Sequence, residues 1–165
     1  METLVGTSLG GYKLERLIGS GTVGQTYAAI DSAGGHAAVK VLYPSLSLFT
    51  KVQAFWDEQT RVAELSHPHV VVATTADWSM SGRFFLAMDL LDGVDLDQAL
   101  ARCGKLPPAQ VLLFAGQICL ALEAVHQLGL CHGALKPRNI YLVPREASRI
   151  SFPDEEPNFI NPAGT

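Results

Sequence analysis

The stretch GSGTVGQTYAAIDSAGGHAAVK, residues 19–40, decides how the first half of this chain is expected to fold. Its glycines have the spacing G-x-G-x-x-G, which occurs where backbone amides approach the phosphates of a nucleotide. In a dinucleotide-binding fold, this motif joins a strand to a helix, so a helix would have to begin directly after Gly24. The residues QTYAAID have a strand pattern instead, which favours a glycine-rich hairpin that covers the phosphates from above.

Strand patterns lie on both sides of this hairpin. Residues 12–20 alternate apolar and polar side chains, and a third strand at 36–43 follows the turn signal Gly34-Gly35. Two more strands are predicted at 69–78 and 83–91, on either side of a turn at Ser81-Gly82. Five antiparallel strands are therefore expected.

A helix is predicted between the third and fourth strands, over residues 48–66. Its apolar residues lie near helical spacing, and Pro68 ends the segment: Val52, Phe55, Val62 and Leu65. A short helix is expected within 92–100. These elements indicate an α+β fold in which a five-stranded sheet with one inserted helix precedes a mainly helical part.

The clearest periodic element is a long helix over residues 109–128. Pro107-Pro108 supplies its start and Gly129 its end. Its apolar stripe, at intervals of three and four residues, consists of Val111, Phe114, Ala115, Ile118, Leu122 and Val125. We expect this stripe to face a core or a partner chain. Two short strands, at 139–143 and 149–152, and an irregular tail over 153–165 complete the chain.

Composition excludes several classes of function. The chain has 165 residues, is 48% hydrophobic, and carries a formal net charge of −4 from 12 basic and 16 acidic residues, with no basic run. Such a chain is expected to bind neither nucleic acid nor an anionic membrane. It has no basic start followed by an apolar stretch and no uninterrupted apolar run of 18 residues, so we expect a cytoplasmic protein.

Cysteine and histidine spacing gives no strong metal or disulfide signal. Cys103, Cys119 and Cys131 lack C-x-x-C spacing, and buried small hydrophobes are their simplest interpretation. His67 and His69 would lie on one side of an extended segment, as in a metal site, but spacing suggests no third ligand.

A lysine and a glutamate strengthen the nucleotide hypothesis. Lys40 lies in the third predicted strand, from which an ammonium group could reach phosphate oxygens. Glu58, in the next helix, is placed to form an ion pair that would hold this ammonium group. Each residue alone would be an ordinary surface charge. The ordered combination of glycine hairpin, Lys40 and Glu58 predicts a nucleotide site.

The ordered motifs resemble the protein kinase family, in particular the serine/threonine kinases of bacterial type. The resembling segments are YKLERLIGSGTVGQTYAAID, AAVKVL, FWDEQTRVAELSHPHVV, FFLAMDLLDGVDLDQAL and LPPAQVLLFAGQICLALEAVHQLGLCHGALKPRN. The resemblance runs from about Tyr12 to Asn139. It implies an N-terminal extension over 1–11, an N-terminal lobe over 12–91, a partial helical C-terminal lobe over 92–152, and the tail. The A-P-E segment of the family is not present.

The resemblance also implies roles for residues of the adenine pocket. Thr26 stands where the family usually has a valine that packs on adenine, and Ala38 keeps the expected small residue. Met88 is in the gatekeeper position. Asp89, Leu90 and Leu91 match the hinge, where backbone groups meet the adenine base. ATP is therefore the implied cofactor.

The catalytic loop, CHGALKPRN, departs from the family pattern H-R-D-L-K-P-x-x-N. His132 is kept, but Gly133 replaces the arginine that often holds a phosphorylated activation loop. Ala134 replaces the aspartate that accepts the proton of the substrate hydroxyl. Because a methyl group cannot accept a proton, this change removes a factor of about 10² to 10⁴ from catalysis.

The expected metal and phosphate ligands are incomplete. Lys136 and Asn139 match the phosphate-contacting lysine and the second magnesium ligand of the family, although they could equally hold the loop by hydrogen bonds. No D-F-G triplet follows, and Phe152 or Pro153 occupies the place of its aspartate. Asp154, with Glu155 and Glu156 behind it, is a substitute ligand only if the loop shifts. Mg²⁺ binding is therefore in doubt.

These departures predict a pseudokinase, a kinase-like binding or scaffolding module in signalling, with a residual ATP site and without normal phosphoryl transfer. The alternative is an unconventional, slow serine/threonine kinase that uses Asp154 or a neighbouring acid. We expect the partner to be another protein chain, or a second copy, bound through the apolar face of the helix at 109–128.

Overall fold

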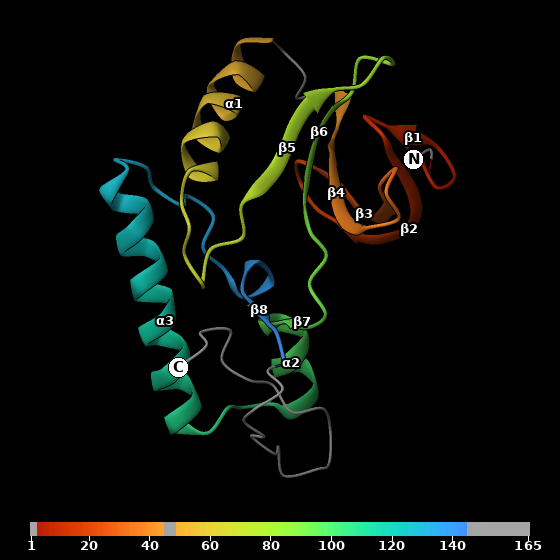
Figure 1. Ribbon diagram of the computed structural model, residues 1–165. Coiled ribbons are helices and arrows are strands. Elements are labelled where there is room, and N and C mark those ends of the chain that lie inside the picture. Colours follow the sequence, from red (N-terminus) through yellow and green to blue (C-terminus); the bar gives the residue numbers. More distant parts are fainter. Residues whose placement is uncertain (1–2, 45–48, 145–165) are drawn as a thin grey trace. The chain divides into compact units, whose positions relative to one another are not determined.

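The computed structural model describes residues 3–44 and 49–144 (Figure 1). It has two compact units. Unit 1 comprises Met1–Glu64 and Val71–Leu90, and unit 2 comprises Leu65–Val70 and Leu91–Thr165. The units therefore divide within the predicted hinge, between Leu90 and Leu91. The short segment Leu65–Val70, which follows the first helix, groups with unit 2.

Unit 1 is built on a six-stranded antiparallel sheet with the strand order β1-β2-β3-β4-β6-β5. The five expected strands are present, and one short strand is added at the N-terminal edge. The strands are β1 (Ser8–Leu9), β2 (Tyr12–Ser20), β3 (Gly24–Ile30), β4 (His36–Leu42), β5 (Ala73–Trp78) and β6 (Phe84–Asp89). β5 begins four residues later than predicted.

One face of this sheet carries the main hydrophobic core. Tyr27, Val39 and Ala87 lie in neighbouring strands at matched register positions, and all three are fully buried. Leu14, Val41 and Phe85 extend the same cluster. The alternation of these strands places their other residues on the opposite face.

The N-terminal segment adds to this core. Leu4 and Leu9 are buried in the same cluster, and the backbone amide of Leu4 donates a hydrogen bond to the hydroxyl oxygen of Tyr27 at 3.3 Å. Gly10 makes the turn between β1 and β2 with φ +54°, and a Cβ atom there would lie 2.1 Å from Cζ of Phe85. Glycine is required at position 10 because the chain passes directly over this ring.

The opposite face of the sheet contacts the helix α1 (Phe49–Ala63). The ring of Trp56 lies 5.7 Å from that of Phe84, and Trp78 packs edge-on against Phe84 at 5.4 Å. Leu42, Phe84 and Leu86 form the buried cluster at this contact. The inserted helix predicted from the sequence is therefore present and packs on the sheet.

In its described part, which ends at residue 144, unit 2 contains two helices and a two-stranded sheet. Its elements are β7 (Val94–Asp95), α2 (Leu96–Cys103), α3 (Pro108–Gln127), the 3₁₀ turn η2 (Pro137–Asn139) and β8 (Tyr141–Leu142). β8 falls within the predicted strand at 139–143 and pairs with β7, which was not predicted. The predicted strand at 149–152 and the tail lie outside the described residues. A small core of Ala99, Phe114 and Leu142 joins these elements.

The predicted apolar stripe of α3 faces the unit in part. Phe114 is buried and Ile118, Leu122 and Val125 are half-buried, whereas Val111 is 48% exposed and Ala115 is exposed. The other buried side chains of α3 are Gln110 and Gln117. The helix is apolar all round, so periodicity could not decide which side packs on the unit. By length and composition alone α3 could also cross a membrane, a weak signal that core helices of soluble proteins share.

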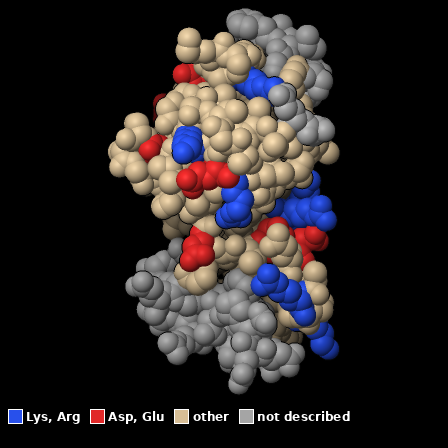
Figure 2. Space-filling view, turned by 90° about the vertical axis from the view of Figure 1, so that its right-hand side faces the viewer, with Lys and Arg blue, Asp and Glu red and all other residues tan. Residues whose placement is uncertain are grey.

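Charged side chains of both signs are interspersed on the face of the molecule that Figure 2 shows. Lys and Arg do not form one continuous basic surface there, and Asp and Glu lie between them.

Candidate nucleotide site and degenerate catalytic loop

The glycine-rich segment is a tight hairpin between β2 and β3. The amide of Gly21 donates to the carbonyl oxygen of Gly24 at 2.9 Å, and the amide of Tyr43 donates to that of Val23 at 3.0 Å. The hydroxyl groups of Ser20 and Tyr43 are 3.1 Å apart. A strand begins at Gly24, so the dinucleotide-binding interpretation, which required a helix there, is wrong.

The three glycines of this hairpin have different surroundings. A Cβ atom on Gly24 would lie 2.2 Å from the carbonyl oxygen of Val41, so the fold itself requires glycine there. A Cβ atom on Gly19 or Gly21 would meet nothing closer than 3.9 Å, and neither residue has a positive φ. Packing within the fold does not require glycine at positions 19 and 21. The space that a side chain would occupy at these positions is free for a bound group.

Residues predicted to form the nucleotide pocket share one face of the sheet. Thr26 pairs with Lys40 across β3 and β4, and Gly19 pairs with Thr26 across β2 and β3. One step along the sheet, Ala38 pairs with Met88 across β4 and β6. Directly opposed residues of antiparallel strands point to the same side. Gly19, Thr26, Ala38, Lys40 and Met88 therefore form one continuous surface within unit 1.

Lys40 and α1 lie on the same side of the sheet. Lys40 pairs with Leu86, which belongs to the cluster that α1 covers through Trp56. Lys40 is half-buried, and Glu58 lies on α1 with an exposed side chain. The Lys40–Glu58 ion pair stays a prediction, although the elements that carry the two residues are adjacent.

The predicted hinge spans the division between the units. Asp89 is the last residue of β6, pairs with Ala37 and is exposed. Leu90 is the last residue of unit 1 and Leu91 begins the second part of unit 2. The hinge role of their backbone groups stays a prediction.

The catalytic-loop sequence forms a closed, hydrogen-bonded loop within unit 2. The side-chain nitrogen Nδ2 of Asn139 donates to the carbonyl oxygen of Ala134 at 2.7 Å. The amide of Ala134 donates to the carbonyl oxygen of His132 at 2.8 Å and contacts Nδ1 of the same residue at 3.2 Å. Gly133 has φ +67°, a conformation that other residues adopt at a cost. The loop closes without an aspartate at position 134.

Asn139 fits the loop-holding role that the sequence left open. Its amide nitrogen is committed to Ala134, while its Oδ1 atom has no hydrogen bond in the described part of the chain. One amide can therefore hold the loop and still present an oxygen ligand. Lys136 is exposed, and its predicted phosphate contact remains untested.

An ion pair that the sequence did not reveal fastens this loop to α2. Nε of Arg138 lies 2.7 Å from Oδ2 of Asp97, at the first turn of the helix. The hydrogen bond and the charge of Asp97 raise the pKa of Arg138. The two residues are 41 positions apart, so no local spacing rule could have joined them.

The described residues do not provide a complete metal site. In residues 3–44 and 49–144, no group of three or more His, Cys, Asp or Glu side chains is placed to hold a metal ion. Asn139 is the one predicted magnesium ligand in this part of the chain. Asp154, Glu155, Glu156 and the place of the D-F-G aspartate lie outside it, so the donors present do not by themselves fit Mg²⁺.

His67 and His69 form a local pair. Their rings are 5.4 Å apart, and Nδ1 of His67 accepts a hydrogen bond from the amide of His69 at 3.2 Å. Burial, and to a lesser extent the neighbouring His67, lowers the pKa of His69. No third ligand joins them among the described residues.

A curled antiparallel sheet with a glycine hairpin, a lysine on its third long strand and one packed helix, followed by a mainly helical part, defines a protein-kinase-like fold. Comparison with known proteins agrees. Residues 12–151 match the family described as protein kinase domain. The chain belongs to the protein kinase family.

Relatives place it near mycobacterial serine/threonine kinases. It is 35% identical over 144 residues to the serine/threonine-protein kinase PknH of Mycobacterium bovis, covering 86% of this chain and 24% of PknH. It is 34% identical over 139 residues to PknD of Mycobacterium tuberculosis, covering 82% and 21%. The chain thus spans about a quarter of the length of these relatives.

Solved structures of the PknI kinase domain of Mycobacterium tuberculosis share the fold. One superimposes with a TM-score of 0.77 at 30% identity, covering 87% of this chain and 59% of that domain. A double mutant of the same domain gives a TM-score of 0.80 at 29% identity, covering 88% and 59%. The predicted α+β kinase-like fold is confirmed.

Proposed function

We propose that this chain is a pseudokinase: a kinase-like module that binds ATP and does not carry out normal phosphoryl transfer. The observation that carries the proposal is the loop at positions 132–139. Asn139 closes it on the carbonyl oxygen of Ala134, so the loop keeps a defined shape, but position 134 offers a methyl group where a proton acceptor is needed.

Retained nucleotide binding is supported by the glycine hairpin. Gly19 and Gly21 leave space that the protein does not fill, at the end of the sheet face that carries Thr26 and Lys40. Backbone amides there could approach phosphate oxygens, and the Lys40 ammonium group would add a charge-assisted contact. Ala38 and Met88, next along the same face, would bound the base.

Loss of transfer is supported by the chemistry of the described loop. In-line attack on a phosphoryl group depends on positioning and on charge stabilisation, with an aspartate that orients the acceptor hydroxyl. Ala134 cannot orient a hydroxyl or accept its proton. Mg²⁺, if bound, would supply charge neutralisation at the phosphates, and Asn139, the one predicted ligand in the described part of the chain, provides too few oxygen donors by itself to hold it.

Calorimetric titration with ATP, with EDTA or with Mg²⁺ present, tests the proposal. We expect binding in both conditions, with dissociation constants that differ little, because residues 3–44 and 49–144 supply only Asn139 of the predicted Mg²⁺ ligands. Lys40→Ala should weaken binding by about tenfold, the loss of one charge-assisted contact. Lys13→Ala, which removes an exposed lysine from β2, is the matched control and should bind like the unaltered chain.

Two outcomes would overturn the proposal. Absence of ATP binding in both conditions would remove the nucleotide site and leave only a kinase-shaped scaffold. Transfer of labelled phosphate to serine or threonine peptides that disappears in Lys40→Ala would instead establish the slow, unconventional kinase.

A further inference from the structure

Helix α3 exposes a leucine face, defined as Leu112, Leu113, Gly116 and Leu120. The three leucines are 75%, 37% and 52% exposed. On its buried side the same helix places Gln110 and Gln117; in the described part of the chain, Oε1 of Gln110 and Nε2 of Gln117 have no hydrogen-bond partner. The helix therefore buries two amide side chains beside Phe114 and leaves three leucines exposed on another side, although exposed leucines are unfavourable in water.

Gly116 lies at the centre of this face and has no role within the unit. A Cβ atom there would meet nothing within 4 Å, and its φ is not positive. Glycine inside a helix destabilises it by comparison with alanine. In helix pairs, small residues at the crossing point let two backbones approach closely.

We propose that the leucine face pairs in antiparallel orientation with the same face of a second copy of this chain. In a pair with its twofold axis at Gly116, Leu112 of one copy lies against Leu120 of the other, and Leu113 lies against Cys119. An isologous contact of this kind is self-complementary, because each residue pair occurs twice. The partner leucines cover the surfaces that water otherwise contacts.

Charge favours the antiparallel arrangement over a parallel one. From Pro108 to Leu122 the helix carries no acidic or basic side chain, and Glu123 is the first. The helix N-terminus has neither an acidic residue in its first turn nor a side-chain cap. Antiparallel pairing sets Glu123 against Ala109 of the other copy, beside that positively polarised end. Parallel pairing would instead set Glu123 against Glu123 of the other copy, so that two negative charges face each other.

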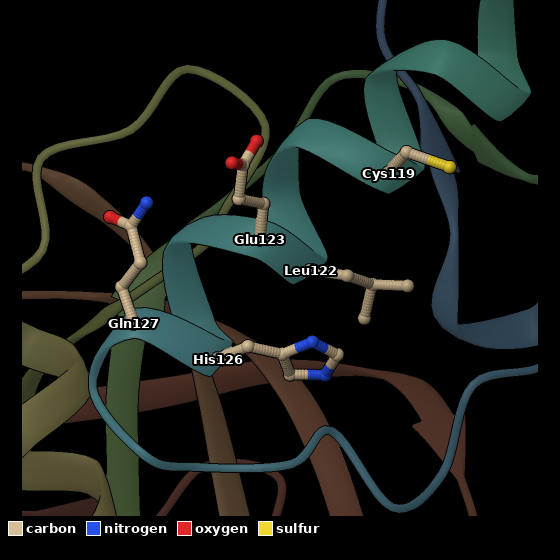
Figure 3. A pocket seen from close by; sticks show the side chains of 5 residues that line it. All are labelled: Cys119, Leu122, Glu123, His126 and Gln127. Carbon is tan, nitrogen blue, oxygen red and sulfur yellow. The ribbon is translucent and has the colours of Figure 1, made fainter.

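A shallow, open depression lies beside the leucine face. Its volume is about 480 Å³, and it is bordered by Cys119, Leu122, Glu123, His126 and Gln127, all from α3. Figure 3 shows Cys119, Leu122 and His126 pointing to one side of the helix and Glu123 and Gln127 pointing away from them. Leu113 of the second copy would reach the Cys119 end of this depression.

Sedimentation velocity over a concentration series tests the pairing. We expect the unaltered chain to shift reversibly from monomer to dimer. Leu112→Lys and Leu120→Glu should each raise the dissociation constant about tenfold or more, since each buries a charge against a leucine. Met80→Lys, at the fully exposed tip between β5 and β6, is the control and should dimerise normally.

The double variant Leu112→Lys, Leu120→Glu distinguishes the two orientations. Antiparallel pairing brings each introduced lysine beside an introduced glutamate, so dimerisation should recover. Gly116→Leu should weaken dimerisation while leaving the thermal midpoint of the monomer equal or higher, because leucine favours helix. If this face served only the stability of the monomer, Gly116→Leu would not weaken dimerisation while keeping or raising the thermal midpoint.

Several results would overturn the inference. The first is a chain that stays monomeric at all soluble concentrations. The second is a dimer that Leu112→Lys and Leu120→Glu leave unchanged. A double variant that remains dissociated rules out the antiparallel pair. Binding of the monomer to neutral phosphatidylcholine vesicles, lost in Leu112→Lys, would assign the face to a membrane instead.

Discussion

At the scale of single residues, Gly21 and Gly24 occupy the same hairpin but differ in what surrounds them. A Cβ atom on Gly24 would lie 2.2 Å from the carbonyl oxygen of Val41 in the neighbouring strand, whereas one on Gly21 would meet nothing closer than the carbonyl oxygen of Gly24 at 4.0 Å. The G-x-G-x-x-G motif marks both positions as glycine and does not distinguish a glycine required for packing from one that leaves room for a ligand. Their different contributions become visible only when the strand pairing is known.

Alanine substitutions should separate these contributions. Gly24→Ala places a methyl group 2.2 Å from a backbone oxygen, so we expect it to lower the free energy of unfolding by about 1–3 kcal/mol. Gly21→Ala should change it by less than about 0.5 kcal/mol, as surface substitutions usually do. Urea unfolding followed by circular dichroism measures both. An equal loss in the two variants would contradict this account.

The sequence predicted the chemical losses of the catalytic loop better than its contacts. The replacements at Gly133 and Ala134 are visible in the sequence CHGALKPRN itself. The loss of a charged side chain can be recognised without a structure. The bond from Asn139 to the Ala134 carbonyl and the ion pair of Arg138 with Asp97 required the structure. Both depend on how the loop folds back on itself and on α2.

At the scale of elements, α2 is short and depends on its N-cap. The carboxylate of Asp95, buried in β7, accepts a hydrogen bond from the amide of Gln98 at 2.9 Å. Asp97, two residues later in the first turn of α2, is exposed and pairs with Arg138. The two aspartates are close in sequence but have different partners: Asp95 accepts from a backbone amide of the helix, and Asp97 forms an ion pair with a side chain of the loop.

Asp95→Ala should therefore destabilise unit 2 by about 1 kcal/mol, the usual cost of a lost N-cap. Asp97→Ala is the matched control, and loss of an exposed ion pair should cost clearly less. Chemical unfolding followed by far-ultraviolet circular dichroism can compare the two variants. A larger loss from Asp97→Ala would show that the ion pair, and not the cap, holds α2.

Strands and helices of unit 1 were predicted closely because their patterns are local. β2, β3, β4 and α1 have alternation or helical spacing, with Gly34 turning the chain at φ +88°. The packing side of α3 was predicted only in part: Phe114 is buried and Ile118, Leu122 and Val125 are half-buried, but Val111 and Ala115 are exposed. A helix with apolar residues on most sides does not reveal from its pattern alone which side is buried. β7 was missed because two residues are too few to form a pattern.

At the scale of the whole molecule, the described parts of the two units have buried clusters of unequal size. Within residues 3–44 and 49–144, the larger cluster of unit 1 contains nine buried residues, whereas the cluster of unit 2 contains three. Buried apolar area is the main source of stability, so the units need not unfold together.

Hydrogen exchange should reveal this inequality. We expect amides of β3, β4 and β6 to exchange more slowly than those of α2 and β8, measured at a protein concentration that keeps the chain monomeric. Uniform exchange of both groups at one rate would indicate a single cooperative unit. Amides of the Gly19–Gly24 hairpin, at the exposed end of the sheet, serve as the fast-exchanging reference.

The position of Leu4 and Leu9 has a practical consequence for anyone who isolates this domain. The family match begins at residue 12, yet both leucines are buried beneath Tyr27 and Phe85, and Gly10 is fitted to the Phe85 ring. A fragment trimmed to residues 12–151 would lose two core side chains, each worth about 1.5–3 kcal/mol, and uncover an aromatic surface. The family match marks only where the shared sequence begins. A stably folded fragment of this chain should therefore also include Leu4 and Leu9, where the packing of the core begins.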